Sequence, residues 1–127
     1  MHIKPLDPPA IYPTGADYRH GIEITGHTRT VYIAGTMGLD AEGRPAADLA
    51  TQLDLIWSNI SAILAEAAMT TANIVRVTSY LTDRAQVEAN QQARIAALNG
   101  RAVPTTAIVV ATLDPAWLVE IEVIAVA

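Results

Sequence analysis

The chain of 127 residues contains no cysteine. It therefore has no disulfide framework, no thiolate nucleophile and no cysteine-bound metal. Basic residues are also few, eight against thirteen acidic ones, which gives a net charge of −5, and they form no Lys/Arg run. Because a protein that binds a phosphate backbone needs a basic surface, the composition argues against nucleic acid as a partner.

Long apolar runs are missing as well. The chain has no stretch of about 18 apolar residues, as a membrane-spanning helix requires, and its first residues lack the apolar core of a signal peptide. We therefore expect a cytoplasmic protein with no membrane partner. The three histidines, His2, His20 and His27, follow no metal-ligand spacing, so we expect them to be exposed or locally bonded and predict no metal.

Apolar residues make up 51% of the chain and charged residues 17%. This length and composition predict one folded domain, residues 1–127, rather than a disordered chain. The apolar share is high for so small a domain, which favours apolar surface left over for a partner subunit.

The hydrophobic periodicity predicts seven elements after an irregular, proline-rich lead-in over residues 1–16. The expected elements are a hairpin of strands 18–24 and 30–36, a helix over 47–68, a strand over 74–81, a helix over 85–98, and final strands 103–113 and 118–126 joined by a turn at Asp114–Pro115. The expected inward stripes are Leu49, Leu53, Ile56, Ile60, Ile63 and Ala67 on the first helix, and Val87, Gln91, Ile95 and Leu98 on the second, with Asn90 and Arg94 at its edge.

This alternation predicts an α/β (α+β) fold, a single mixed β-sheet with two helices on one face in the order β-β-α-β-α-β-β. In the last strand, Ile121 and its apolar neighbours point to one face, while Glu120 and Glu122 point to the other. The strand from Thr105 is apolar on both faces, so both faces are expected to be covered. Because no further element covers the second face, we expect several subunits to pack their open faces together.

Several segments, taken together and in this order, resemble the YjgF/RidA family. They are residues 32–36 with the acidic, glycine-containing loop that follows, residues 52–59, residues 76–83, and the final segment from Pro104 through Leu113 to Glu122. The resemblance covers residues 15–126. It implies a chorismate-mutase-like homotrimer with a small-molecule cleft at each subunit interface, which agrees with the uncovered sheet face inferred from the residues alone.

The best-known members of that family hydrolyse reactive enamines and imines, such as 2-aminoacrylate, to a 2-keto acid and ammonia, without a metal or cofactor. The resemblance therefore implies a deaminase in which Glu120 is the catalytic residue. The substrate-binding residues that it implies are Tyr18, Gly35, Asn90, Thr105 and Thr106. The chain departs from the family at Thr105, where deaminases carry an arginine that grips the substrate carboxylate, and at residues 34–36, where they show Ser-Gly-Gln.

The missing arginine affects the expected function most. The Thr105 hydroxyl can bond a neutral oxygen but cannot neutralise a carboxylate, and losing a charged hydrogen bond costs about 1.5–3 kcal/mol of binding. Arg19, Arg76 and Arg101 are candidate replacements. Two functions thus stand side by side: an enamine/imine hydrolase or a relative with an altered substrate, and a non-catalytic module that binds a metabolite in the same cleft. Endoribonuclease activity, as reported for some relatives, is disfavoured by the acidic charge balance.

Each candidate also has a structural interpretation. Glu120 is either an acid–base group at an interface or a solvated strand charge, and Glu122 fits better as a rim or ion-pair residue. Thr105 and Thr106 either present hydroxyl and N–H groups to a ligand or simply begin a strand. Gly35 marks either a β-bulge or a close approach to the backbone.

The aromatic and amide candidates have the same two interpretations. Tyr18 either closes the cleft or packs in the fold. Asn90 either touches the ligand or bonds a backbone group. Trp57 and Trp117 fit best as filler of the core and of an interface.

Overall fold

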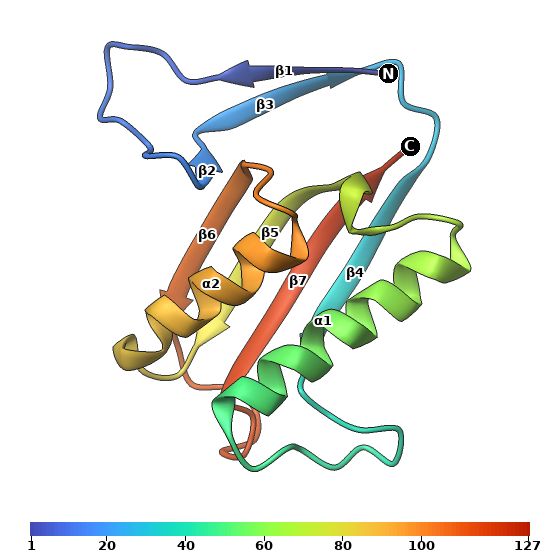
Figure 1. Ribbon diagram of the computed structural model, residues 1–127, viewed down its shortest axis with the longest axis vertical. Coiled ribbons are helices and arrows are strands. Elements are labelled where there is room, and N and C mark those ends of the chain that lie inside the picture. The colour runs from blue at the N-terminus through green and yellow to red at the C-terminus, as the bar shows by residue number, and fades with distance from the viewer.

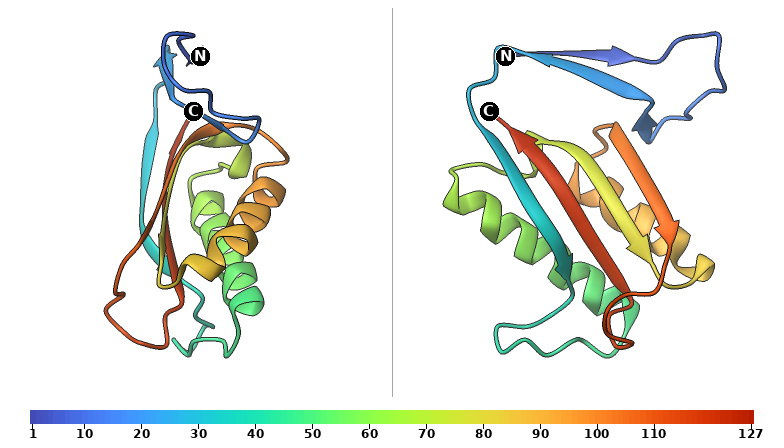
Figure 2. Two further views of the ribbon diagram at one scale, coloured as in Figure 1. Left: turned by 90° about the vertical axis from the view of Figure 1, so that its left-hand side faces the viewer. Right: turned by 180° about the vertical axis from the view of Figure 1, so that it is seen from behind.

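The computed structural model describes all residues from 1 to 127, and it contains one five-stranded mixed sheet with two helices on one face (Figures 1 and 2). The strands lie in the order β2 (Tyr18–Arg19), β6 (Val103–Val109), β5 (Ile74–Leu81), β7 (Val119–Val126) and β4 (Thr30–Met37). The helices are α1 (Leu49–Glu66) and α2 (Val87–Ala97), and two short helical turns, η1 (Thr71–Asn73) and η2 (Arg84–Gln86), precede β5 and α2. The predicted fold class is confirmed.

Short polar side chains set the helix ends. Asp48 caps α1, because its carboxylate accepts from the Thr51 backbone N–H at 2.8 Å. Asp83 and Gln86 form a capping box at η2, which leads directly into α2. After α2, Asn99 and Gly100 both take positive φ angles, so the chain ends the helix there as predicted.

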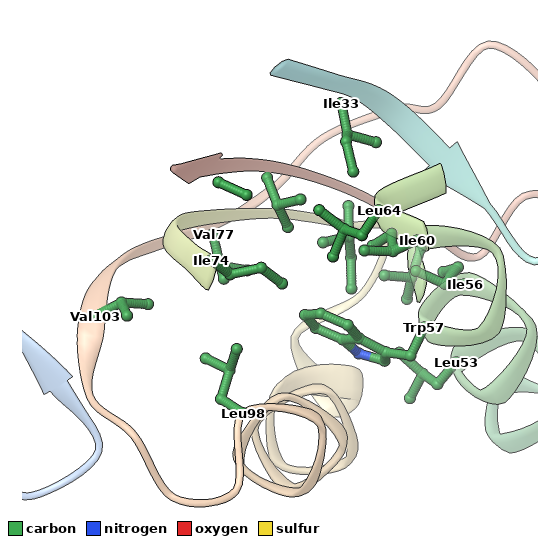
Figure 3. Close-up of a cluster of buried hydrophobic side chains, with 14 of the residues drawn as sticks. Ile33, Leu53, Ile56, Trp57, Ile60, Leu64, Ile74, Val77, Leu98 and Val103 are labelled. Carbon is green, nitrogen blue, oxygen red and sulfur yellow. The ribbon is translucent and has the colours of Figure 1, made fainter. Parts of the chain in front are cut away.

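The core lies between the helices and one face of the sheet (Figure 3). From β7 it receives Ile121 and Val123, which are 0% and 1% exposed, as the predicted alternation requires. From α1 it receives Leu53, Ile56, Trp57, Ile60 and Leu64. Ile63, which was expected in that stripe, is instead 43% exposed, and the stripe continues through Leu64, with Trp57 widening it in the middle of the helix.

The inward face of α2 differs more from the expectation. Val87 is 47% exposed, whereas Asn90 and Arg94 are buried beside the predicted Leu98. Arg94 is buried because its guanidinium donates to the Asp17 backbone carbonyl at 2.8 Å and to the Asp17 carboxylate at 2.7 Å. The ion pair fastens α2 to the segment that leads into β2, and it gives a buried charge the partner that burial requires.

The lead-in is not wholly irregular. Residues His2–Leu6 form β1, which pairs antiparallel with β3 (Gly21–Thr25) in a separate two-stranded ribbon. Pro5 is compatible with this outer strand, because a missing N–H is tolerated where no further strand follows. The predicted hairpin of residues 18–24 and 30–36 does not form. Instead Thr28 and Arg29 donate their backbone N–H groups to the Ala127 carbonyl, so the chain entering β4 is paired with the end of β7.

The two final strands are also not neighbours. β6 runs parallel to β5, and β7 lies on the other side of β5, antiparallel to both β5 and β4. β6 ends at Val109, so residues 110–118 form a longer connection than expected, with the predicted turn inside it, where the Trp117 N–H donates to the Asp114 carbonyl. Seen edge-on in Figure 2, the helices cover one side of the sheet and leave the other side uncovered. Tyr32 on that open face is 77% exposed.

Candidate functional site on the open sheet face

A band of polar side chains crosses the middle of the open face. The register of β5 and β7 places Thr78 opposite Glu122 and Tyr80 opposite Glu120. On the other side of β5, Thr106 of β6 lies beside Thr78. Because neighbouring residues in register share a face, side chains from three strands meet here without any contribution from the helices.

Two hydrogen bonds organise the band. Arg76 donates from Nη2 to the Thr106 hydroxyl at 2.7 Å, and the Tyr80 hydroxyl donates to Oε1 of Glu122 at 2.5 Å. The pKa of Tyr80 is raised above its ordinary value, chiefly because the phenol donates to that carboxylate, with desolvation and the charge of Glu122 adding to the rise. Oε1 of Glu122 is therefore engaged as the acceptor of the Tyr80 hydroxyl.

Gly35 makes room for Glu120. A Cβ atom at position 35 would overlap the Glu120 carboxylate and would lie 2.8 Å from its Cδ atom. The pairing of β4 with β7 also shifts between Ile33 and Thr36, which marks a β-bulge at this glycine. Both interpretations of Gly35 hold together, because the bulge brings bare backbone beneath the carboxylate. The Glu120 side chain is half-buried and accepts no hydrogen bond from the chain.

The band borders two depressions. The larger, of about 610 Å³, is lined by Arg76, Thr78 and Glu122 together with the apolar Tyr32, Ala34 and Ile124. The smaller, of about 270 Å³, lies between Tyr80, Glu120 and residues 110–113 of the β6–β7 connection. The hydrogen bond between Tyr80 and Glu122 thus connects the rims of the two depressions. Their volumes suit small molecules rather than macromolecules.

Three of the predicted site residues come together on this face, namely Glu120, Gly35 and Thr106. The other three lie elsewhere in the single chain. Thr105 is in register with the core residue Val77, and its hydroxyl donates to the Val103 carbonyl. Asn90 is 3% exposed on the helix side, and its Oδ1 has no hydrogen-bond partner. Tyr18 lies in the edge strand β2, beside Val103.

Of the three candidate arginines, Arg76 is the one on the open face. Arg19 forms an ion pair with Asp7 at 2.8 Å, and Arg101 donates to the backbone carbonyls of Thr71 and Ile74. Burial lowers the pKa of Arg101, although the group remains cationic. Arg76 was predicted only as one of three possible replacements for the missing arginine, and Tyr80 was not predicted as a site residue. The strand alternation over residues 74–81 puts both on one face of their strand.

Other kinds of site find little support in the structure. No group of three or more His, Asp or Glu side chains is arranged to hold a metal ion. His20 is locally bonded, as expected, with its Nε2 2.6 Å from the Tyr12 carbonyl oxygen. Neither helix is long and apolar enough to cross a membrane.

A helix-backed mixed sheet with a polar cluster on its free face defines a class of small α+β proteins, and comparison with known sequences identifies the family. The profile of the family described as Endoribonuclease L-PSP matches residues 10–127, so the chain belongs to that family, and its relatives confirm the resemblance to YjgF/RidA proteins.

One relative is a RutC family protein of Aquifex aeolicus, 36% identical over 77 residues, which are 60% of this chain and 58% of that protein. A second is the RutC family protein YjgH of Escherichia coli, 32% identical over 79 residues, or 58% of this chain and 60% of that protein. Each match thus spans less than two thirds of the curated relative. Among solved structures, the Rid family protein YyfB of Yersinia pestis is 25% identical, covers 100% of both chains and has a TM-score of 0.83.

Proposed function

We propose that this chain hydrolyses a small reactive enamine or imine to a carbonyl compound and ammonia, with Glu120 as the acid–base residue. The observation that carries the proposal is the setting of Glu120. Its carboxylate faces a depression, accepts no hydrogen bond from the chain and lies over a glycine that leaves space for it. A positioned carboxylate with a free oxygen suits proton transfer to and from a small substrate.

The reaction needs water and one group that carries a proton. Water adds to the imine carbon while Glu120 takes one of its protons. Glu120 passes that proton to the nitrogen, which gives the carbinolamine. Glu120 then takes the hydroxyl proton and passes it to the amino nitrogen, so the C–N bond breaks, the C=O bond forms and ammonia leaves. The balance is imine plus water to carbonyl compound plus ammonia, and Glu120 ends as the carboxylate. An enamine enters the same sequence after it takes up a proton at carbon and gives one up from nitrogen, which makes it the imine.

Self-association would enclose this site. The open face carries exposed apolar residues around the polar band, with Tyr32 at 77% and Ile108 at 46% exposed, and a homotrimer that packs these faces together would bury them. Exclusion of water strengthens the electrostatic interactions of a carboxylate with its substrate. Tyr18, Asn90 and Thr105 remain proposed ligand contacts only in such an assembly, where the edge of one subunit meets the open face of the next.

A non-catalytic module that binds a metabolite in the same cleft is the alternative. The observation that favours it is Thr105, which brings no charge to β6 and turns its hydroxyl to the backbone of Val103. In this case the carboxylates of the band would bind a ligand without catalysing its conversion. We further propose that the protein acts in the cytoplasm.

An assay that generates 2-aminoacrylate in situ separates the two functions. The wild-type protein should speed formation of the 2-keto acid above the rate in buffer. Glu120→Gln should slow it by about 10²–10⁴-fold, the usual contribution of acid–base catalysis. Glu23→Gln is the matched control, because Glu23 is exposed on the separate ribbon, and it should keep the full rate.

Each other outcome of this assay has one meaning. If the wild-type protein does not accelerate the reaction, the hydrolase is wrong for this substrate and the binding module stands. A full rate in Glu120→Gln would remove Glu120 from the mechanism. Light scattering on the same samples should give the mass of a trimer, and a monomer mass would contradict the enclosed cleft.

A further inference from the structure

Arg76 has donors to spare on the open face. A guanidinium carries five N–H donors in a planar fork, and the Arg76 side chain makes one hydrogen bond, from Nη2 to Thr106. The same side chain lines the larger depression, together with Thr78 and Glu122. Thr106 thus fixes one end of the fork and leaves other N–H groups for a group that enters the depression.

The charges around Arg76 do not neutralise one another directly. Arg76 and Glu122 line the same depression, yet they form none of the four ion pairs of the chain. Oε1 of Glu122 is occupied by Tyr80, and Glu120 lies next to it along β7 with no hydrogen bond. Arg76 and Glu122 therefore face the larger depression without a direct ion pair between them, and Glu120 lines the smaller depression beside it.

This pattern selects a ligand by its charge. A simple anion would be drawn to Arg76 but repelled by Glu120 and Glu122, while a simple cation would meet the opposite balance. A molecule that carries an anionic and a nitrogen-bearing end satisfies both sides. The fork of a guanidinium matches the two oxygens of a carboxylate, which makes carboxylate the fitting anion.

We propose that Arg76 is the specificity-determining residue of this cleft, and that it binds the carboxylate of a small amphoteric ligand whose nitrogen faces Glu122. The inference rests on the proposed function for the place of the cleft, and it deepens that function by naming the residue that selects the ligand by charge. A protonated imine next to a carboxylate has this charge pattern. The charge that Thr105 cannot supply from β6 is then supplied from the neighbouring strand β5.

Binding of three molecules of similar shape tests the proposal on the intact protein without any turnover. The probes are L-alanine, which is amphoteric, propanoate, which has only the carboxylate, and isopropylamine, which has only the nitrogen. Titrations followed by NMR should show L-alanine binding more tightly than either of the other two. Arg76→Gln should weaken L-alanine binding by about 10–100-fold, as expected for the loss of a charged hydrogen bond.

Two further variants separate the effect of the guanidinium fork from the effect of charge alone. Arg76→Lys retains the charge without the fork and should fall between the wild type and Arg76→Gln. Arg84→Gln makes the same change of charge at an exposed side chain without hydrogen bonds, at the start of η2, and should bind as the wild type does. Melting curves of each variant establish that it is folded.

The inference is overturned if the wild type does not bind L-alanine, if propanoate or isopropylamine binds equally well, or if Arg76→Gln changes nothing. It is also overturned if Arg84→Gln has the same effect as Arg76→Gln. Failure of the proposed function is a separate result. Binding that depends on Arg76 without turnover of 2-aminoacrylate supports the inference and rejects the hydrolase, whereas turnover that is unchanged in Arg76→Gln does the reverse.

Discussion

On the helix-facing side of β7, Val119, Ile121 and Val123 are at most 1% exposed and belong to the core. On the other side of the same strand, Glu120 and Glu122 are half-buried among polar neighbours and face the open side of the sheet. The two sides of this one strand therefore differ in both burial and polarity. The helix-facing side gains free energy from apolar burial, while the open side keeps two half-buried carboxylates, of which Glu122 accepts a hydrogen bond from Tyr80.

The difference implies that alternate residues of β7 serve different purposes, one set stabilising the fold and the other set forming the candidate site. Odd-numbered positions from 119 to 125 hold the fold together, because their side chains lie under α1 and α2. Even-numbered positions 120 and 122 are free to carry chemistry, because the fold does not depend on them. Substitutions on the two sides should therefore have distinct effects, which two pairs of variants examine. A third experiment examines the ion pair that fastens α2, away from β7.

The largest effect is expected from a matched pair of truncations at adjacent positions. Ile121→Ala should lower the free energy of unfolding by about 2–5 kcal/mol, because it leaves a cavity in a core where Ile121 is 0% exposed. Glu120→Ala should change it by no more than about 0.5 kcal/mol. Urea unfolding at one protein concentration measures both, and equal losses would mean that the two sides of β7 are not independent.

A second pair of variants examines the glycine beneath Glu120. Gly35→Ala should displace the Glu120 carboxylate and cost about 1–3 kcal/mol, because the new methyl group has no space. Gly21→Ala is the control, since its nearest atom would lie at an ordinary 3.6 Å. Thermal melting gives the stability change and the 2-aminoacrylate assay gives the rate. A fully active and stable Gly35→Ala protein would show that Glu120 does not need this position.

The smallest effect is expected at acidic pH, at the ion pair that anchors α2. The hydrogen bond from Arg94 lowers the pKa of Asp17 in the folded protein, so the folded state binds that proton less readily than the unfolded state. The stabilisation is therefore complete above the unfolded pKa, about 3.9, and is lost as the pH falls through the lower folded pKa.

Acid unfolding followed by circular dichroism measures this contribution. Asp17→Asn should be less stable than the wild type at neutral pH, and the difference should shrink below about pH 4. Asp54→Asn, at an exposed residue of α1, is the control and should follow the wild-type curve. A constant difference between Asp17→Asn and the wild type at every pH would show that the Asp17 charge is not what stabilises the contact.

Local patterns in the sequence predicted those features that depend on neighbouring residues. The alternation of Val119–Val126 and the end of α2 shortly before Gly100 follow from side chains within a few positions of one another. The inward face of α2 could not be predicted in this way. Arg94 is buried because Asp17, 77 residues earlier in the chain, supplies its acceptor, and helical spacing carries no information about such a partner.

The order of the strands in the sheet could not be predicted from the sequence for a similar reason. Strands that follow one another in the sequence often pair, which suggested two hairpins, but β5 lies between β6 and β7, and β3 pairs with β1. For the site, alternation placed Glu120 on the side of its strand away from the apolar residues, but it gave Tyr80 no role and did not distinguish Arg76 from Arg19 and Arg101. The roles of Arg76 and Tyr80 are seen only in the folded chain, where they form hydrogen bonds with Thr106 and Glu122 on neighbouring strands.

The position of β7 also bears on how the chain folds. β7 joins β4 to β5, and its register pairs Val126 with Thr30 and Ala125 with Ile74, across long stretches of chain. The segment from 30 to 81 holds two strands that do not touch until β7 is inserted between them. During synthesis, the core cannot close before β7 has left the ribosome, and until then the apolar faces of α1 and β5 remain open to other molecules.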